Sequence, residues 1–359
     1  MVDTPLGPSV WAASDGRAGN AAQVRAVVRA LSETQRWMRI AHINAKGHRA
    51  DPITLTPSAP WTWLPPNLWP SPLRSLPKSE RAVFKPPWPT IWISAGRRSA
   101  PFAAKVRTWS GGETLVVHIL DPRIPPDAFD LVVAPNHDAL EGSNVVSTLG
   151  APAYFAPDDI EDAGLAFADL ADEPGRKAVV VLGGDSNTHK FSTAAAQTLS
   201  ERLRALSGQG WRLRITGSRR TPVPVRAQFR QLADDIGAQY WDGPADGPNP
   251  YLAWLLFSEA AIVTEDSANM LSDAAYFGLP IHMAKLDGGS PKFDRLHQGF
   301  IDRGCARWFD GALEAWSYEP LREADKVADA IVELLIQRRA QPEMPAIADG
   351  PRLGDYDRR

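Results

Sequence analysis

The sequence predicts an α/β protein with two domains, each built on a parallel sheet. Three observations support this prediction. The chain has 359 residues, more than the roughly 100–200 of one ordinary domain. Apolar strand-like runs alternate with helical patterns, which favours parallel sheets. Polar or glycine-rich turns follow one strand after another, as they do at the ligand-binding edge of such sheets.

Composition agrees with a globular protein and excludes some partners. Hydrophobic residues make up 44% and charged residues 23%, which is ordinary for folded domains. Residues 1–150 carry 16 Lys and Arg against 11 Asp and Glu, a balance of +5, and the remainder carries 23 against 31, a balance of −8. This excess is too small and dispersed for a nucleic-acid partner. Cys305 is alone, so no disulfide can form within the chain and a reducing compartment fits.

The location that we expect is cytoplasmic. No apolar run reaches the roughly 18–20 residues that span a bilayer, and the N-terminus MVDTPLGPSVWAASDG lacks the basic start and apolar core of a secretory signal. A Pro- and Trp-rich stretch at 52–89 leaves two interpretations open. Its tryptophans at 61, 63, 69 and 88 could contact the inner face of a membrane peripherally, or they could pack over the edge of a core.

Apolar periodicity and turn residues predict the elements of the first half. Strands are expected at 9–13, 38–43, 91–94, 114–120 and 131–134, and helices at 21–31 and from about residue 100. The proline-rich stretch 52–89 excludes a long regular helix there. The acidic stretch 156–175 is interpreted as the boundary between the halves.

The second half repeats the alternation. Strands are expected at 177–182, 211–216, 240–241, 261–264 and 279–283, and the strand at 279–283 is expected to be the last. Helices are expected at 193–206, 229–236 and 323–339, with two more that end at residues 257 and 277. We therefore divide the chain into an N-terminal domain at 1–155, a C-terminal domain at 156–322, a C-terminal helix at 323–340 and a frayed tail at 341–359.

The strongest candidate binding residues follow three strands of the C-terminal half. Gly183 and Gly184, with Ser186, allow a close backbone approach to a ligand, although a plain strand-to-helix turn also uses glycine. The next turn contains Ser218, Arg219, Arg220 and Thr221. Its two guanidinium groups and two hydroxyls suit phosphate oxygens. Alternatively, its arginines form ion pairs with acids on the surface.

The third turn follows the strand at 261–264. Ser267 is placed to cap the next helix, and the amides from residue 268 through Asn269 to Met270 could then receive a phosphate. Glu265 and Asp266 could instead stabilise the positive end of the helix dipole. Glu265 could also have a structural role or bind a metal. Asp273, six residues after Ser267, could take ribose hydroxyls.

The N-terminal half supplies the candidate acceptor side. Its first turn contains Asp15, the leading candidate for the catalytic acid/base group, among Ser14, Gly16, Arg17, Gly19 and Asn20. A tight turn also favours Asp and Gly without any function. Arg97 and Arg98 could bind an anion. His137 and Asp138 are adjacent, and neighbours in sequence seldom face the same way. Seven scattered histidines give no metal-ligand spacing, so no metal site is expected.

These strand-end motifs together carry a family resemblance from Trp11 to Phe309. The motifs are SDGRAGN, ISAGRRSAP, ILDPR, FDLVVAPNHD, NVVSTLGAP, VVLGGDS, ITGSRRTP and NPYLAWL…VTEDSANMLSDAAYFGLP. They resemble the plant "elongated mitochondria" fission-factor family and its bacterial relatives. The resemblance implies a GT-B-like α/β fold, with two Rossmann-like domains facing a central cleft and a C-terminal helix that crosses back onto the first domain.

The resemblance also implies a site and an activity. Ser267 and its helix match the place where GT-B enzymes hold the donor diphosphate, and Asp273 matches the acid that binds the donor ribose. Asn136 stands where the family's block has an acid. The implied function is a metal-independent glycosyltransferase that needs no cofactor and moves a sugar from a nucleotide sugar to an envelope or lipid-linked acceptor. A nucleotide-sugar epimerase and a non-catalytic fission-factor-like adaptor are the alternatives.

Overall fold

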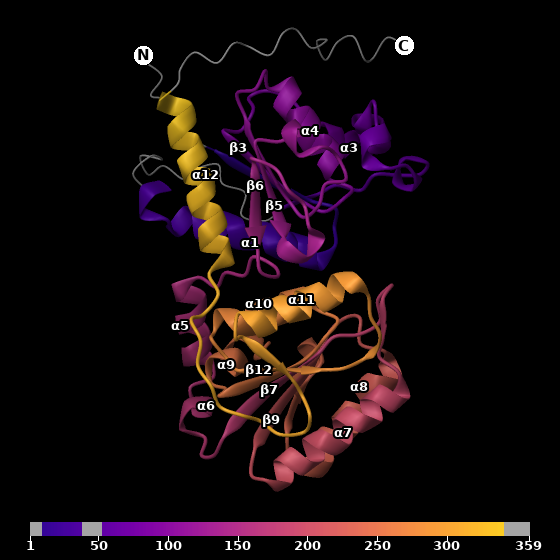
Figure 1. Ribbon diagram of the computed structural model, residues 1–359, viewed down its shortest axis with the longest axis vertical. Helices are drawn as coiled ribbons and strands as arrows, with labels where there is room; N and C mark the ends of the chain where they lie inside the picture. The colour runs from indigo at the N-terminus through magenta and orange to yellow at the C-terminus, as the bar shows by residue number, and fades with distance from the viewer. Residues whose placement is uncertain (1–8, 38–51, 341–359) are drawn as a thin grey trace. The chain divides into compact units, whose positions relative to one another are not determined.

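Two six-stranded parallel sheets organise the chain in the computed structural model, which describes residues 9–37 and 52–340 (Figure 1). The strand expected at 38–43 and the tail from 341 lie outside the described residues. The described residues form two units. One comprises the chain up to Thr148, Pro152–Tyr154 and the segment from Glu323 on, and the other comprises Leu149–Ala151 and Phe155–Arg322.

The sheet of the first unit has the strand order β2-β1-β3-β4-β5-β6. Its strands are β1 (Val10–Ser14), β2 (Ile53–Thr54), β3 (Ile91–Ala95), β4 (Leu115–Ile119), β5 (Leu131–Pro135) and β6 (Val145–Thr148). The central strands are apolar runs buried on both faces, as parallel sheets require. Sequence analysis did not identify β2, which is only two residues long, or β6, whose first residues are half-buried.

Helices and an irregular segment cover the two faces of this sheet. Ile91 and Ile93 of β3 face the core that contains α1 (Ala18–Glu33) and α12 (Glu323–Ala340). Trp92 faces the opposite core, with α4 (Ala100–Trp109) and part of the Pro-rich segment. The period of two along β3 therefore assigns each side chain to one of two apolar layers.

The Pro-rich segment forms short turns rather than a long helix, as expected. It contains the 3-10 turns η1 (Trp61–Trp63), η2 (Pro66–Leu68) and η3 (Pro72–Ser75) and the single α-turn α3 (Lys78–Arg81). Figure 1 shows α3 beside α4, and both η2 and η3 contact α4. Proline has no amide hydrogen to donate, so the backbone here forms short turns in place of a long helix.

The C-terminal helix α12 completes the first unit. It packs against α1 and buries Val327, Ile331 and Leu335. Near its end, Arg338 donates to Asp130, 2.9 Å away, which also accepts from Arg107 at 3.0 Å. Like the other described helices, α12 is not long and apolar enough to cross a membrane.

The sheet of the second unit has the order β10-β9-β7-β11-β12-β14. Its strands are β7 (Lys177–Leu182), β9 (Arg212–Gly217), β10 (Gln239–Trp241), β11 (Ala260–Thr264), β12 (Ile281–Ala284) and β14 (Ala306–Trp308), and a separate antiparallel pair is formed by β8 (His189–Lys190) and β13 (Asp287–Gly288). The strand expected as the last, at 279–283, is therefore not the last. The strand β14 is only three residues long and two of them, Arg307 and Trp308, are exposed, so its sequence has no buried apolar run that would predict a strand.

Helices cover both faces of the second sheet. On one face α7 (Thr193–Gly208) and α8 (Val223–Ile236) lie side by side (Figure 1). On the other lie α9 (Tyr251–Leu256), α10 (Ala268–Tyr276) and α11 (Pro291–Asp302). The expected boundary stretch 156–175 is not a plain linker, because it forms α5 (Pro157–Ala166) and α6 (Asp169–Asp172). Its acids at the first turn of α5 favour a helix start.

Truncation of Ile331 should destabilise the protein, because its side chain is 0% exposed in the core shared by α12 and the first sheet. We expect Ile331→Ala to lower the free energy of unfolding by roughly 2–5 kcal/mol. Arg339→Ala, at an exposed position of the same helix, should change it by less than about 0.5 kcal/mol. Urea denaturation followed by circular dichroism measures both. Equal stability of the two variants would show that α12 does not complete this core.

Candidate functional site

Three polar turns meet at the carboxyl edge of the second sheet because their strands are neighbours. In the register of this sheet, Leu182 of β7 pairs with Gly217 of β9, and Val181 pairs with Val263 of β11. The turns after these strands begin at Gly183, Ser218 and Glu265. Parallel pairing therefore brings together residues more than 80 positions apart in sequence.

A buried carboxylate, that of Asp266, joins the three turns. Its side chain has 0% exposure and accepts hydrogen bonds from Arg220 Nη2 at 2.7 Å, Thr264 Oγ1 at 2.7 Å and the Gly184 amide at 3.0 Å. A buried carboxylate is stable only when such donors replace water. Protein donors therefore occupy this carboxylate in the described structure, and a contact of Asp266 with a ligand stays a prediction.

The two glycines after β7 are needed for packing between the turns. A Cβ at Gly183 would lie 2.0 Å from Asp266 Oδ1, and a Cβ at Gly184 would lie 2.1 Å from the Arg220 carbonyl oxygen. No side chain fits at those distances. Both glycines are buried, so the close approach expected for a ligand is made here by neighbouring turns.

Thr221 and Ser218 shape the turn after β9. The buried Thr221 hydroxyl donates to the Leu182 carbonyl at 3.1 Å and accepts from the Ser218 amide at 2.8 Å. Arg226 holds the turn from the first part of α8, since its guanidinium donates to the carbonyls of Thr221 at 2.9 Å and Ser218 at 3.1 Å. Arg226 was not among the residues that the sequence motifs suggested. The available signal was an arginine one turn after the expected SRRTP motif.

The two arginines of this turn differ in their partners. Arg220 is 41% exposed and forms the ion pair with Asp266. Arg219 is exposed, and its guanidinium makes no hydrogen bond or ion pair with the described residues. Arg219 is therefore the cation of this turn that remains open to an anion from solution.

The turn after β11 starts α10 with a capped end. Ser267 is the N-cap, and its hydroxyl accepts from the Met270 amide at 3.5 Å. The Met270 amide thus has a partner within the protein, and its contact with a phosphate stays a prediction. Asn269 is half-buried in the same first turn, where the positive end of the helix dipole favours an anion.

Glu265 and Ser186 have structural roles. Glu265 Oε1 accepts from the Leu286 amide at 2.7 Å, and its carbonyl accepts from His297 Nε2 at 2.8 Å. Burial raises the pKa of Glu265. The Ser186 hydroxyl accepts from the amides of Thr188 and His189 at 3.2 and 3.0 Å. These contacts join the antiparallel pair to the sheet edge.

Asp273 pairs with a tyrosine from a different helix. The Tyr251 hydroxyl of α9 donates to Asp273 Oδ2 at 3.0 Å. Burial raises the pKa of Asp273 to about 7, and the hydrogen bond from Tyr251 opposes that rise. Tyr251 lies 22 positions before Asp273 in the sequence, so no local sequence pattern predicts this pair.

The candidate acid/base residue Asp15 lies at the carboxyl edge of the first sheet. Its Oδ1 accepts from Asn20 Nδ2 at 2.8 Å and from the Arg17 amide at 3.3 Å. Gly96, in the turn after β3, has φ +95, and a Cβ there would lie 2.7 Å from Asp15 Oδ2. The carboxylate is thus oriented by Asn20 and fitted against the neighbouring turn.

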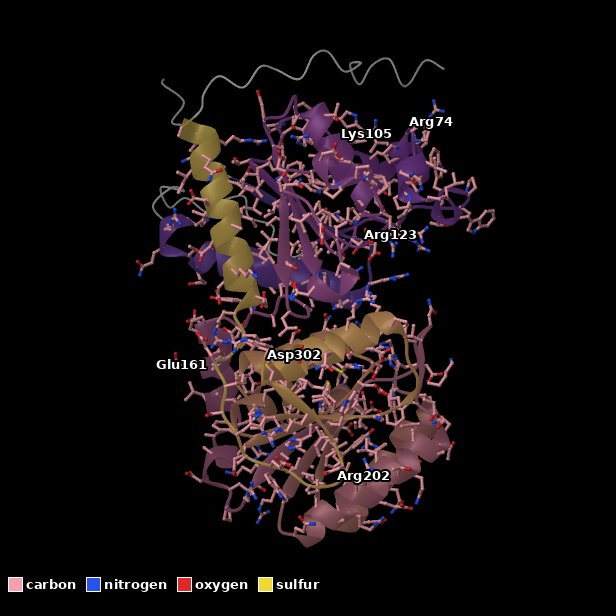
Figure 2. All side chains as sticks on the ribbon, viewed as in Figure 1. Arg74, Lys105, Arg123, Glu161, Arg202 and Asp302 are labelled. Carbon is pink, nitrogen blue, oxygen red and sulfur yellow. The ribbon has the colours of Figure 1, made fainter. Side chains whose placement is uncertain are left out.

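Three exposed arginines lie at the same edge. The guanidinium groups of Arg17, Arg97 and Arg98 make no hydrogen bond or ion pair with the described residues. Arg123, labelled in Figure 2, instead pairs with Asp121 at 3.0 Å. The remaining candidates support the first turn: Ser14 is buried and its hydroxyl accepts from the Gly16 amide at 3.3 Å, and Gly19 and Asn20 belong to α1.

The adjacent His137 and Asp138 do approach each other, against expectation. The turn η5 (Asn136–Asp138) brings His137 Nε2 within 4.0 Å of Asp138 Oδ1, with both side chains largely buried. This distance is too long for a hydrogen bond. In residues 9–37 and 52–340, no group of three or more His, Cys, Asp or Glu could hold a metal ion.

Asp273 should make stability depend on pH. The unfolded carboxyl titrates near 3.9, so between about pH 4 and 7 only the native state holds the proton. The free energy of unfolding therefore falls as pH rises through this window. Asp273→Asn keeps an acceptor for Tyr251 and has no proton to lose.

We expect the melting temperature of Asp273→Asn, relative to that of wild type, to increase from pH 4 to pH 8. The increase in this difference should be at least about 2–4 °C, which corresponds to about 1 kcal/mol. Glu201→Gln, an exposed carboxyl on α7, serves as the control and should show no such gain. A constant difference between Asp273→Asn and wild type across this range would contradict the assignment.

Comparison with solved structures gives the fold class. The chain superimposes on the UDP-GlcNAc 2-epimerase of Neisseria meningitidis, solved with UDP-GlcNAc bound, with a TM-score of 0.51, 12% identity and coverage of 92% of this chain and 100% of that one. At this identity the similarity concerns the fold alone. It confirms the GT-B-like α/β class with two Rossmann-like units.

Comparison of sequences gives the family. Over 286 residues the chain is 28% identical to "mitochondrial fission protein ELM1" of Arabidopsis thaliana. The alignment covers 72% of this chain and 66% of the plant protein, which is just under two thirds of its length. Over 285 residues it is 29% identical to "uncharacterized protein RP120" of Rickettsia prowazekii (strain Madrid E), covering 68% of this chain and 79% of that protein. The model of the family described as "Mitochondrial fission ELM1" matches residues 18–335. The chain therefore belongs to the mitochondrial fission ELM1 family.

Proposed function

We propose that this protein binds a nucleoside diphosphate sugar at the carboxyl edge of its second sheet and transfers the sugar to an envelope or lipid-linked acceptor in the cytoplasm. One observation carries the proposal. Asp266, Arg220 and Thr221 of this edge bond to other parts of the protein, whereas the exposed Arg219 guanidinium makes no hydrogen bond or ion pair with the described residues. In parallel α/β sheets this edge is where ligands bind.

A diphosphate suits the groups that remain open at this edge. Arg219 supplies a guanidinium group, which matches phosphate oxygens. The Ser218 hydroxyl of the same turn already accepts from the Arg220 amide at 3.2 Å, so it orders the turn. The start of α10 adds the positive end of a helix dipole. Because Arg220 already neutralises Asp266, the buried acid does not repel an incoming phosphate.

The proposed transfer balances as a substitution at the anomeric carbon. An acceptor hydroxyl oxygen forms a bond to that carbon, and the bond from the carbon to the phosphate oxygen breaks. The hydroxyl proton passes to Asp15, whose carboxylate Asn20 orients through the 2.8 Å hydrogen bond. The nucleoside diphosphate departs with the added negative charge, which Arg219 stabilises. The proposal assigns no metal and no cofactor to this step.

Two alternatives predict different products. A nucleotide-sugar epimerase, the activity named for the Neisseria meningitidis protein of the same fold, would change the donor with no acceptor present. A non-catalytic adaptor would bind partners and leave the donor intact. The exposed Arg219 favours a ligand over an adaptor role, because convergent polar groups at a sheet edge serve binding.

Arg219→Ala should weaken the binding of UDP and leave stability unchanged. Loss of a charge-assisted contact of about 1.5–3 kcal/mol corresponds to a roughly 10- to 150-fold rise in Kd, which calorimetry measures. Arg204→Ala, an exposed arginine on α7 that pairs with Asp235, is the matched control. Arg220→Ala should differ from both by lowering the melting temperature, since it leaves Asp266 without its cation. Unchanged UDP affinity in Arg219→Ala would place the donor elsewhere.

Asp15→Asn should abolish transfer and preserve donor binding. The amide keeps the shape of the carboxylate and cannot take a proton, so the rate should fall by roughly 10²–10⁴-fold. Asp121→Asn changes another acid at this edge, which pairs with Arg123, and should retain activity. Radiolabelled sugar transfer to a lipid extract measures the rate, and UDP calorimetry checks binding. Full turnover by Asp15→Asn would exclude it as the base.

A further inference from the structure

The aromatic residues of the Pro-rich segment divide into an inner and an outer set. Trp69 is 5% exposed and contacts Phe102 of α4, with the ring centroids 6.1 Å apart. Trp61 packs against Trp69 at 5.9 Å, and Trp88 stacks on Trp109 at 6.5 Å. Three of the four tryptophans that could have contacted a membrane are thus part of the core of the first unit.

The outer set consists of three exposed apolar side chains that are close in sequence. Trp63 is 78% exposed, Leu68 is 55% exposed and Leu64 is 38% exposed. Among the described residues, only Leu165, Val223 and Trp308 are also large, hydrophobic and exposed, and each of these belongs to a separate part of the second unit. Single exposed apolar residues are ordinary, whereas three within six positions need an explanation. We call Trp63, Leu64 and Leu68 the apolar lobe.

Local hydrogen bonds hold the apolar lobe in an ordered conformation. The amides of Trp63, Leu64 and Leu68 donate to carbonyls three residues earlier, at 2.9–3.0 Å. The buried Trp69 donates from its indole nitrogen to the Leu64 carbonyl at 3.3 Å, which connects the lobe to the core. Pro60, Pro65 and Pro66 further restrict the backbone. Because the backbone of the lobe is already ordered, binding through these exposed side chains costs little additional conformational entropy.

The sequence segment that carries the apolar lobe is basic. Residues 56–88 contain four cations, Arg74, Lys78, Arg81 and Lys85, against a single acid, Glu80. The Glu80 carboxylate accepts from the amide and the hydroxyl of Thr56, so it serves the turn. Lys78 and Lys85 are exposed and make no ion pair with the described residues. Figure 2 labels Arg74 and Lys105 in the part of the first unit that carries α3 and α4.

We infer that the apolar lobe and the neighbouring cations dock the first unit on an anionic lipid bilayer. Tryptophan and leucine enter the interfacial region of a membrane, and lysine and arginine attract its anionic headgroups. A second copy of the chain fits less well, because it would bring the same cations together. The inference does not depend on the proposed transferase activity, which involves other residues.

Vesicle co-sedimentation of the full chain tests the inference. Wild type should bind vesicles that contain about a third phosphatidylglycerol in phosphatidylcholine, and should not bind phosphatidylcholine alone. The triple variant Trp63→Ser, Leu64→Ser, Leu68→Ser should reduce the partition coefficient by at least about tenfold. Lys78→Gln with Lys85→Gln should reduce it by roughly fivefold for each cation removed.

A matched control is available in the second unit. Leu165→Ser with Val223→Ser removes two equally exposed apolar side chains and should bind anionic vesicles as wild type does. All variants change exposed side chains, so unaltered circular dichroism and unaltered UDP affinity should accompany the loss of lipid binding. Wild-type sedimentation of the triple variant, or equal binding to both lipids, would overturn the inference. Self-association lost in the triple variant, without vesicle binding, would overturn it too and identify the lobe as a contact between copies.

Discussion

Burial of the Asp266 carboxylate is the constraint on which the second unit's candidate site depends. A charged group withdrawn from water must find donors, and Asp266 finds them in the turns after β7 and β9 and in the last residue of β11. The carboxylate leaves no room for a side chain at Gly183 and pairs with Arg220, whose own backbone leaves no room for one at Gly184. The polar groups that the sequence assigns to a ligand are thus largely used within the protein, and they leave Arg219 as the open cation.

The first unit solves a similar problem at its own sheet edge. Asp15 accepts from Asn20 and approaches the turn after β3 so closely that Gly96 can carry no side chain. Arg17, Arg97 and Arg98 remain exposed around it. In both units, therefore, the acid in a strand-end turn organises the turn, while arginines beside it face solvent. Mutations of the acids will report on structure as well as on ligands, which makes the matched asparagine variants informative.

Connectivity of the chain adds a second constraint. The last described helix, α12, supplies Val327, Ile331 and Leu335 to the core that α1 begins. Arg338 reaches Asp130, which already pairs with Arg107 of α4. The first unit therefore needs residues from both ends of the described chain, and truncation of the protein after the second sheet would expose one face of the first.

The sequence by itself determined the α/β class, most strands of both sheets, the cap at Ser267 and the strand ends at which the polar residues gather, because these follow from local periodicity and turn chemistry. It missed short elements such as β2 and β14, whose stability comes from neighbouring strands rather than from their own residues. Tertiary structure alone decided which polar residues are free: Asp266 and Arg220 pair across 46 positions, and Tyr251 meets Asp273 across 22. Such pairs form because burial must satisfy charges and hydroxyls, and no spacing in the sequence encodes which turns the sheet will bring together.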